Sequence, residues 1–180
     1  MVPWTDRIIS VTLQAAMPLT FIGAYAVPAK STDKTQAESA KLKTEKDSFY
    51  NTLQEVYTTF SKLGPTHVWG DMNARVGSRS SQKEEHIVGP YTFDPEHAQA
   101  TRQRSEHVEY NRSLLIDFCA ANDCRLTNTY YEKPQAKLAT FYKPRIKSDV
   151  ILPPLRPHWD QLDYLISPHR WKNHITNCEV

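Results

Sequence analysis

The most constraining feature of the sequence is one amphipathic segment, whose apolar residues recur at three- and four-residue spacing. Its apolar positions are Phe49, Leu53, Val56, Tyr57, Phe60 and Leu63. This periodicity predicts a helix with a single apolar stripe, and Gly64-Pro65 ends it. Such a stripe must be buried against another element, so the chain has to supply a matching apolar surface.

Short runs rich in β-branched and aromatic residues predict that surface to be a sheet. The predicted strands are Ile8–Leu13, Leu19–Ala24, Thr66–Trp69, Leu126–Tyr130, Leu138–Tyr142, Leu162–Ser167 and Ile175–Val180. A second helix is predicted to start at an Asn111 cap and to bury Leu114, Leu115, Phe118 and Cys119. Strand pairs with intervening helices, without strict alternation, favour an α+β fold with mixed β-sheets flanked by helices.

The length of 180 residues suits one domain, 1–180, with its own core. Polar composition predicts exposed loops at 30–47, with a frayed helical start as the alternative there, and at 78–108. A third loop is predicted at 143–160, where four prolines stand between Lys143 and Asp160. No internal repeat is apparent.

Charge and cysteine content narrow the function classes. The 22 basic and 20 acidic residues leave a net charge of only +2, so any grip on phosphate has to be local. The three cysteines form an odd set without a CxxC pair, which indicates neither a disulfide framework nor a zinc cluster. A reducing, intracellular compartment is therefore expected.

The apolar stretch from Ile8 to Ala26 superficially resembles a secretory signal. Asp6 weakens the positive leader, and Gln14 and Pro18 interrupt a run that is too short to span a bilayer. Two strands joined by a turn explain the stretch better, and no membrane association is expected.

Gly70-Asp71-Met72-Asn73 follows a predicted strand directly. Polar side chains at the end of a strand commonly project into a cleft at the edge of the sheet. Asp71 and Asn73 are two residues apart, so a slightly irregular backbone can aim both into one pocket. Mg²⁺ prefers oxygen ligands from one or two carboxylates together with substrate phosphate. The alternative is a simple turn built from turn-forming residues.

The string from His67 to Gly77 resembles the strand-then-GDFNAR(V)G signature of the endonuclease/exonuclease/phosphatase superfamily. It looks most like the apurinic-endonuclease-like domain of non-LTR retrotransposons and of host proteins of the craniofacial development protein 2 type. Further motifs follow in the family's order: Leu19–Pro28 resembles "isaYaP", Asn111–Thr129 resembles "N...Ll.FC..n.L.itNT", Ala139–Tyr142 resembles "yTW", and Gln161–Ser167 resembles "qIDYilv". The resemblance implies the superfamily's four-layer α/β sandwich.

The resemblance also implies roles for single residues. Asp71 would orient the attacking water, and Asn73 would help to hold phosphate and metal, so both are the predicted metal ligands. Tyr25 would contact the scissile phosphate, and Asp163 would brace a catalytic histidine. Asn128 is the weaker candidate for a groove contact with substrate.

Each role has a structural alternative. Tyr25 is alternatively a cap on the sheet, and Asp163 an ordinary carboxylate at a strand end. Asn128 is equally a turn former. Arg75 is a candidate contact to the nucleic acid backbone, although a solvated loop arginine fits the sequence equally well.

Departures from the family pattern predict an incomplete domain. The family's first metal-binding glutamate precedes the "Y-P" strand, yet Asp6 is the only acidic residue before Tyr25. The family's closing "SDH" motif is also missing before Val180. The expectation is a four-layer sandwich truncated at both ends and catalytically incomplete as it stands.

The predicted function is phosphodiester hydrolysis on DNA with Mg²⁺, or Mn²⁺ in its place, by a retroelement-type endonuclease domain. The alternative from another class is a non-catalytic remnant or interaction module. A phosphatase or small-molecule phosphodiesterase on the same fold is a third reading, because fold does not determine substrate. Action on DNA would place the protein in the nucleus.

Overall fold

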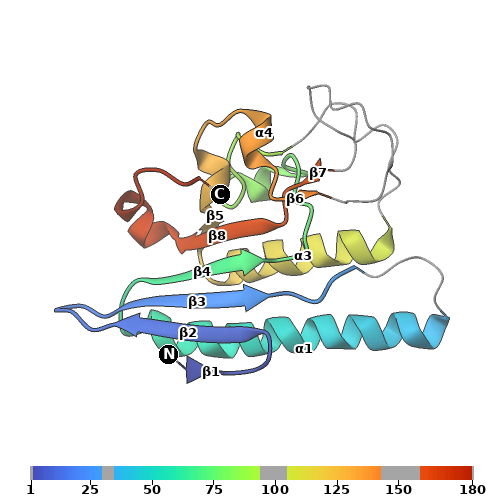
Figure 1. Cartoon of the computed structure of the whole chain (residues 1–180), viewed down its shortest axis with the longest axis horizontal. Helices are drawn as coiled ribbons and strands as arrows, with labels where there is room; N and C mark the ends of the chain where they lie inside the picture. The colour runs from blue at the N-terminus through green and yellow to red at the C-terminus, as the bar shows by residue number, and fades with distance from the viewer. Residues whose placement is uncertain (1, 30–34, 94–104, 143–158, 180) are drawn as a thin grey trace.

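The computed structural model describes residues 2–29, 35–93, 105–142 and 159–179 (Figure 1). The strands are β1 (Val2–Pro3), β2 (Ile8–Leu13), β3 (Leu19–Tyr25), β4 (Thr66–Asp71), β5 (Cys124–Leu126), β6 (Phe141–Tyr142), β7 (Trp159–Asp160) and β8 (Asp163–Pro168). The α-helices are α1 (Gln36–Ser61), α3 (Glu106–Ala121) and α4 (Gln135–Leu138). Short 3₁₀ helices span Gln82–Glu84, Thr127–Tyr130 and His169–His174.

The main sheet has six strands in the order β1-β2-β3-β4-β8-β5. β2 and β3 form the predicted antiparallel pair, whereas β3 and β4 run parallel because α1 crosses between them. β8 is antiparallel to both β4 and β5. The sheet is therefore mixed, as predicted, and a separate pair of short strands joins β6 to β7.

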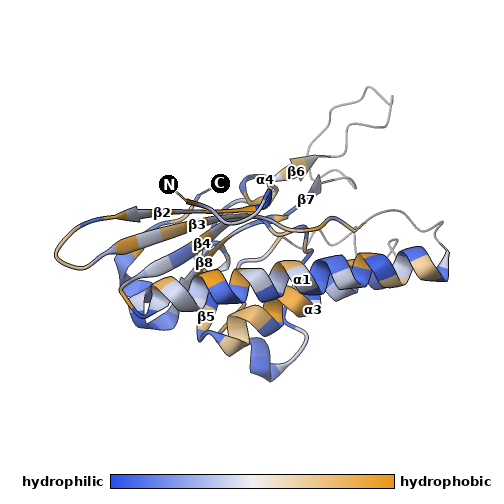
Figure 2. Ribbon diagram, turned by 90° about the horizontal axis from the view of Figure 1, so that it is seen from below, coloured by the Kyte–Doolittle hydropathy of each residue, from blue (hydrophilic) through white to orange (hydrophobic). Residues whose placement is uncertain are grey.

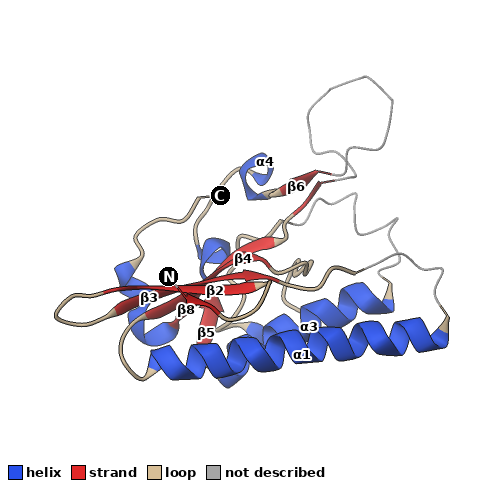
Figure 3. Cartoon of the chain, turned by 60° about the horizontal axis from the view of Figure 1, so that its bottom comes forward, coloured by secondary structure: helices blue, strands red, loops and turns tan. Residues whose placement is uncertain are grey.

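Helices α1 and α3 lie side by side on one face of this sheet (Figure 3). Alternate strand residues point into the layer between sheet and helices. This core includes Ile8, Ile22, Leu53, Val56, Val68, Leu115, Leu126 and Ile166, all of them buried. The described residues thus supply a sheet layer and a helix layer of the expected sandwich.

The opposite face of the sheet is also largely apolar. It carries an open cleft of about 760 Å³ whose walls include Ile9, Val11, Phe21, Trp69 and Leu165. These positions alternate along their strands with the core positions, so their side chains lie on the face away from α1 and α3.

Helix α1 begins earlier than the apolar stripe predicted, which corrects the exposed loop assigned to 30–47. Positions 36–47 are helical, and 30–34 lie outside the described residues. Thr35 and Glu38 form a capping box in which each side chain accepts a backbone N–H of the other residue. The N-terminal turns are largely hydrophilic (Figure 2), so apolar periodicity could not reveal them.

The loop assigned to 78–108 also needs correction. Ile87 and Val88 are buried under the sheet edge, and Val88 forms a bridge to Leu126. Helix α3 starts at Glu106 after Ser105, so Asn111 lies inside the helix and is not its cap. Positions 94–104 lie outside the described residues.

Three predicted strands differ in the structure. The strand predicted at Leu126–Tyr130 changes after Leu126 into a 3₁₀ helix, and the one at Leu138–Tyr142 is strand only at its end. No strand forms at 175–179. Of the loop predicted at 143–160, positions 143–158 lie outside the described residues and the last two form β7.

Candidate active site at the carboxyl edge of the sheet

Three of the candidate site residues meet at one edge of the sheet. β3 and β4 are parallel, so their C-terminal residues Tyr25 and Asp71 are register partners. β8 runs the other way, so its first residue, Asp163, is the partner of Asp71. Strands from distant parts of the sequence thus place a phenol and two carboxylates side by side at one end of the sheet. We call this group of three residues, Tyr25, Asp71 and Asp163, the carboxyl edge.

Asp71 occupies the centre of this row and is partly buried. Its Oδ1 accepts the backbone N–H of Asn73 at 2.8 Å. Burial raises the pKa of Asp71 above its ordinary value, the Asn73 N–H offsets part of the rise, and the charge of Asp163 adds to it. A cation beside the two carboxylates would relieve this repulsion.

Asn73 follows in the left-handed backbone region, with φ of 49°. Its Nδ2 donates to the Ala26 carbonyl at 2.8 Å, which ties the segment after β4 to the segment after β3. This bond fixes the amide, so its Oδ1 keeps one direction relative to Asp71. The Asp71–Asn73 pair predicted from the sequence is therefore brought together.

Tyr25 is 49% exposed at the end of β3. The Arg7 guanidinium lies 5.3 Å from the centre of the Tyr25 ring and donates to the Tyr25 carbonyl at 3.5 Å. The backbone N–H of Tyr25 in turn donates to the Arg7 carbonyl at 2.9 Å. The phenol is thus held at the carboxyl edge with a cation beside it.

Asp163 begins β8, and its backbone N–H donates to Thr140 Oγ1 at 3.1 Å. Thr140 also accepts the Leu162 N–H at 3.0 Å, so one hydroxyl fixes the start of the strand. The described histidines lie elsewhere: His67 contacts Ser167, His107 contacts Ser39, His86 packs on His169, and His174 packs on Trp171. The bracing role of Asp163 stays a prediction.

Asn128 does not face a groove. It is 2% exposed, its Nδ2 donates to the Asp163 carbonyl at 3.1 Å, and its Oδ1 accepts the Leu165 N–H at 3.4 Å. The side chain therefore acts as a backbone partner for β8. This corrects the predicted substrate contact, because the amide is occupied inside the protein.

Arg75 is also engaged. Its guanidinium pairs with the Asp160 carboxylate, with Nε to Oδ1 and Nη2 to Oδ2 both at 2.7 Å. A two-point pair of this kind neutralises the charge and fixes the orientation. The pair ties the motif segment to β7, and the contact of Arg75 with a nucleic acid backbone stays a prediction.

Two further residues hold the motif segment, and sequence reasoning missed both roles. Asn111 of α3 is buried, and its Nδ2 donates to the carbonyls of Asn73 and Val27 at 2.8 and 3.1 Å. The buried Tyr164 hydroxyl lies 3.1 Å from the Ala74 carbonyl and accepts the Val76 N–H at 3.3 Å. A polar residue on the inward face of a helix was the available signal for Asn111.

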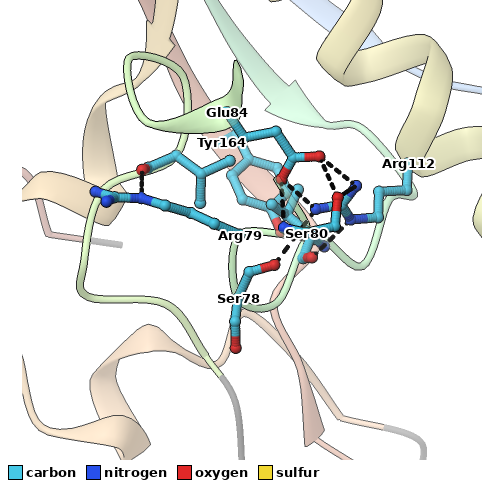
Figure 4. A network of polar contacts seen from close by, with 8 residues as sticks. Ser78, Arg79, Ser80, Glu84, Arg112 and Tyr164 are labelled. Carbon is cyan, nitrogen blue, oxygen red and sulfur yellow. Dashed lines mark hydrogen bonds and ion pairs between the residues drawn. The ribbon is translucent and has the colours of Figure 1, made fainter. Parts of the chain in front are cut away.

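A buried ion pair secures the segment that follows the motif (Figure 4). Arg112 donates to both carboxylate oxygens of Glu84 at 2.9 and 2.6 Å and to the Val76 carbonyl at 2.9 Å. Ser80 adds its backbone N–H to Glu84 at 2.9 Å. Burial favours a higher pKa for Glu84, but the hydrogen bonds from Arg112 and Ser80 prevail and lower it to about 2.

Comparison with solved structures identifies the fold. The chain superposes on the 3′-5′ exonuclease NExo from Neisseria meningitidis with a TM-score of 0.56 and 13% identity, over 95% of this chain and 56% of that one. The 3′ phosphatase NExo from Neisseria, bound to a product DNA hairpin, superposes with a TM-score of 0.55 and 13% identity, over 95% of this chain and 55% of that one. The catalytic domain of Xenopus laevis APE2 superposes with a TM-score of 0.55 and 16% identity, over 93% of this chain and 47% of that one. The chain has the endonuclease/exonuclease/phosphatase fold.

Sequence comparison agrees with the endonuclease/exonuclease/phosphatase fold. Craniofacial development protein 2 from Bos taurus is 27% identical over 176 residues, which are 97% of this chain and 24% of that protein. The protein of the same name from Tragulus javanicus is 27% identical over 132 residues, 73% of this chain and 19% of its own length. The chain spans about a quarter of the length of the first relative and about a fifth of the second. No protein-family model matches it.

The carboxyl edge and the neighbouring Asn73 provide a small set of atoms that could bind a metal ion. Within the described residues, no cluster of three or more His, Cys, Asp or Glu side chains has the spacing of a metal site. Asp71, Asp163 and the Asn73 amide offer oxygen donors only. That set fits Mg²⁺ or Mn²⁺, which accept one or two carboxylates with water and phosphate completing the shell. It does not fit a closed protein cage.

The described residues contain no helix that is long and apolar enough to span a membrane. The longest helix, α1, is instead one of the two helices that pack on the sheet.

Proposed function

We propose that the carboxyl edge is the phosphodiester-hydrolysing site of a DNA-directed, metal-dependent endonuclease domain of the retroelement type. The observation that carries the proposal is the pairing of Asp71 with Asp163 at the ends of adjacent strands, beside an exposed Tyr25. The nuclease and phosphatase neighbours with this fold, one of them bound to DNA, support the same class of reaction.

Each residue has a task in this proposal. Asp71 accepts a proton from the attacking water or orients it, a role open to a carboxylate at a strand end beside the phosphate. Tyr25 donates its phenolic hydrogen to a non-bridging phosphate oxygen, and the backbone N–H of Asn73 positions the Asp71 carboxylate. When bound, Mg²⁺ or Mn²⁺ supplies positive charge that stabilises the developing charge on the phosphate.

We further propose that this chain alone hydrolyses DNA slowly or not at all. Its described residues show no histidine in contact with Asp163 and no group of three or more His, Cys, Asp or Glu side chains that could hold a metal ion. Loss of a single charge-stabilising group commonly reduces a rate by about 100-fold to 1,000-fold. An active nuclease with this site, acting on chromosomal DNA, is proposed to reside in the nucleus.

A plasmid-nicking assay tests both parts. Supercoiled plasmid is incubated with the folded chain and Mg²⁺ or Mn²⁺, with an EDTA arm, with Asp71→Asn, and with the matched control Asp117→Asn on the exposed side of α3. We expect no nicking above the EDTA arm. Nicking abolished by EDTA and by Asp71→Asn, but not by Asp117→Asn, would support the site and overturn the proposed inactivity. Nicking that persists in Asp71→Asn would overturn the site itself.

A further inference from the structure

Asn111 of α3 is a polar residue on the buried face of its helix, and its side chain bonds only to backbone outside that helix. It is 2% exposed, and the same face also carries Leu115 and Phe118. Its Nδ2 donates to the Asn73 carbonyl at 2.8 Å and to the Val27 carbonyl at 3.1 Å. Both N–H groups of the amide are therefore used on two segments that are distant from each other in the sequence.

The acceptor end of the same amide has no comparable use. Among the residues that the structure describes, Asn111 Oδ1 has no hydrogen-bond partner. A buried acceptor without a partner lowers stability, and an apolar side chain of similar size would avoid that cost. An amide at this position is therefore explained by what its two donors hold in place.

The first carbonyl that Asn111 holds belongs to a residue in an uncommon backbone conformation. Asn73 has φ of 49°, in the left-handed region that residues other than glycine seldom adopt. In this conformation the Asn73 N–H donates to Asp71 Oδ1 at 2.8 Å. Because Asn111 binds the carbonyl of the same residue, it stabilises the conformation on which this hydrogen bond depends.

The second carbonyl, that of Val27, lies in the segment that leaves β3 after Tyr25. The same segment is tied to the one that leaves β4, because Asn73 Nδ2 donates to the Ala26 carbonyl at 2.8 Å. Asn111 bonds to both segments from the helix layer. Two strand ends are thus joined to each other and to one residue of α3.

We propose that Asn111 is a positioning residue of the carboxyl edge. Its amide holds the segments after β3 and β4 at a fixed separation, which keeps the Asp71 carboxylate oriented and Tyr25 beside it. The proposal rests on the proposed function, because the groups that Asn111 orients are those assigned to the metal ion and the phosphate. Asn111 is buried and acts only through the backbone that it holds.

Hydrogen exchange of the Asn73 backbone N–H, measured by NMR in the absence of metal, tests the positioning directly. Asn111→Leu removes both donors and keeps a similar volume. It is expected to make this exchange at least about tenfold faster relative to that of the core residue Val68, the effect of about one ordinary hydrogen bond. Asn111→Ser keeps one donor, is expected to give a smaller increase, and carries the test if Asn111→Leu does not fold. An unchanged relative rate in the variant that folds would overturn the proposal.

Gln54→Leu is the matched control, because it also removes an amide that shares two hydrogen bonds with α3. Gln54 and Asn122 donate to each other at 2.8 and 2.7 Å, next to the C-terminal end of that helix. This variant is expected to leave the relative exchange rate of the Asn73 N–H unchanged. An equal increase in Gln54→Leu and in Asn111→Leu would show a general loosening of the helix layer and would overturn the proposal.

Mn²⁺ affinity, measured by electron paramagnetic resonance, then connects this positioning to the site. Asn111→Leu is expected to weaken Mn²⁺ binding by about tenfold, the lower end of the range for residues that orient a metal ligand, and Gln54→Leu is expected to leave it unchanged. Equal affinity in the wild type and in Asn111→Leu would overturn the proposed role at the site. If the wild type itself bound no Mn²⁺, the proposed function would be contradicted, and the exchange rate of the Asn73 N–H would still decide whether Asn111 positions the motif segment.

Discussion

Replacement of Arg112 by methionine is expected to lower the free energy of unfolding by about 3–5 kcal/mol. The change removes both hydrogen bonds to Glu84 and leaves that carboxylate buried without its partner. It also frees the Val76 carbonyl, which Arg112 Nε holds at 2.9 Å. Urea unfolding followed by circular dichroism measures the effect.

Arg79→Met is the matched control, because Arg79 forms a partly exposed pair with Glu85 at 3.7 Å and donates one hydrogen bond from Nε to the Val88 carbonyl at 2.6 Å. Its cost is expected to stay below about 2 kcal/mol, the sum of an exposed ion pair and one ordinary hydrogen bond. The double variant Glu84→Gln with Arg112→Met is expected to recover part of the loss, since no buried charge remains. Equal costs for Arg112→Met and Arg79→Met would contradict the assignment of a buried pair.

The same ion pair predicts an acid dependence. The pKa of Glu84 is lowered from 4.5 to about 2 in the folded state. A depressed carboxyl pKa stabilises the fold above pH 4.5 and loses that contribution as the pH falls toward 2. The loss amounts to about 3 kcal/mol. The double variant Glu84→Gln with Arg112→Met is expected to lack this loss when the free energy of unfolding is measured against pH. The same dependence of that free energy on pH in the wild type and in the double variant would contradict this prediction.

Gly70→Ala is expected to destabilise the fold by more than about 3 kcal/mol, the range for a substitution with both a backbone clash and backbone strain. Gly70 has φ of 143°, and a Cβ there would lie 2.0 Å from the Ala24 carbonyl oxygen. Because Ala24 lies in the neighbouring strand, relief of this clash requires β3 and β4 to separate beside Asp71. The motif glycine is therefore required by the close approach of two strands at the site.

Gly23→Ala provides the matched control on β3. Its Cβ would meet the end of the Ile9 side chain at 3.0 Å, with the other nearest atoms at 3.8 and 4.0 Å. A side-chain end can move, so the cost is expected to remain under about 1.5 kcal/mol. Thermal unfolding of both variants measures the difference, and similar melting temperatures would contradict the role assigned to Gly70.

The position of the candidate site could be predicted from the sequence because its signals are local. A β-branched run followed by Gly-Asp-Met-Asn places Asp71 at a strand end whatever the rest of the chain does. The parallel pairing with β3 and the antiparallel pairing with β8 then bring Tyr25 and Asp163 to the same edge. The family motifs predicted that these residues share one site, whereas the pairing of the strands was not predicted and is shown by the structure.

The roles of Arg75 and Asn128 could not be predicted because their partners are distant in the sequence. Arg75 pairs with Asp160, 85 positions away, and Asn128 bonds to β8, 35 and 37 positions away. A polar side chain in a loop motif looks the same from the sequence whether it faces solvent or another strand. Only the fold shows that both are occupied.

The early start of α1 was missed for a different reason. Apolar periodicity detects the part of a helix that packs, and the first turns of α1 project mostly polar side chains. The capping box of Thr35 and Glu38 was a usable local signal, as a threonine followed three residues later by glutamate. Capping chemistry therefore locates helix ends that the apolar stripe does not reach.

The central claim is that the carboxyl edge binds a divalent cation, and electron paramagnetic resonance titration of Mn²⁺ tests it without any need for turnover. The account predicts one Mn²⁺ site in the wild type that is weakened at least about tenfold in Asp71→Asn, is weakened also in Asp163→Asn, and is unchanged in Asp117→Asn. Mn²⁺ binding that is equally tight in the wild type and in Asp71→Asn would contradict the account.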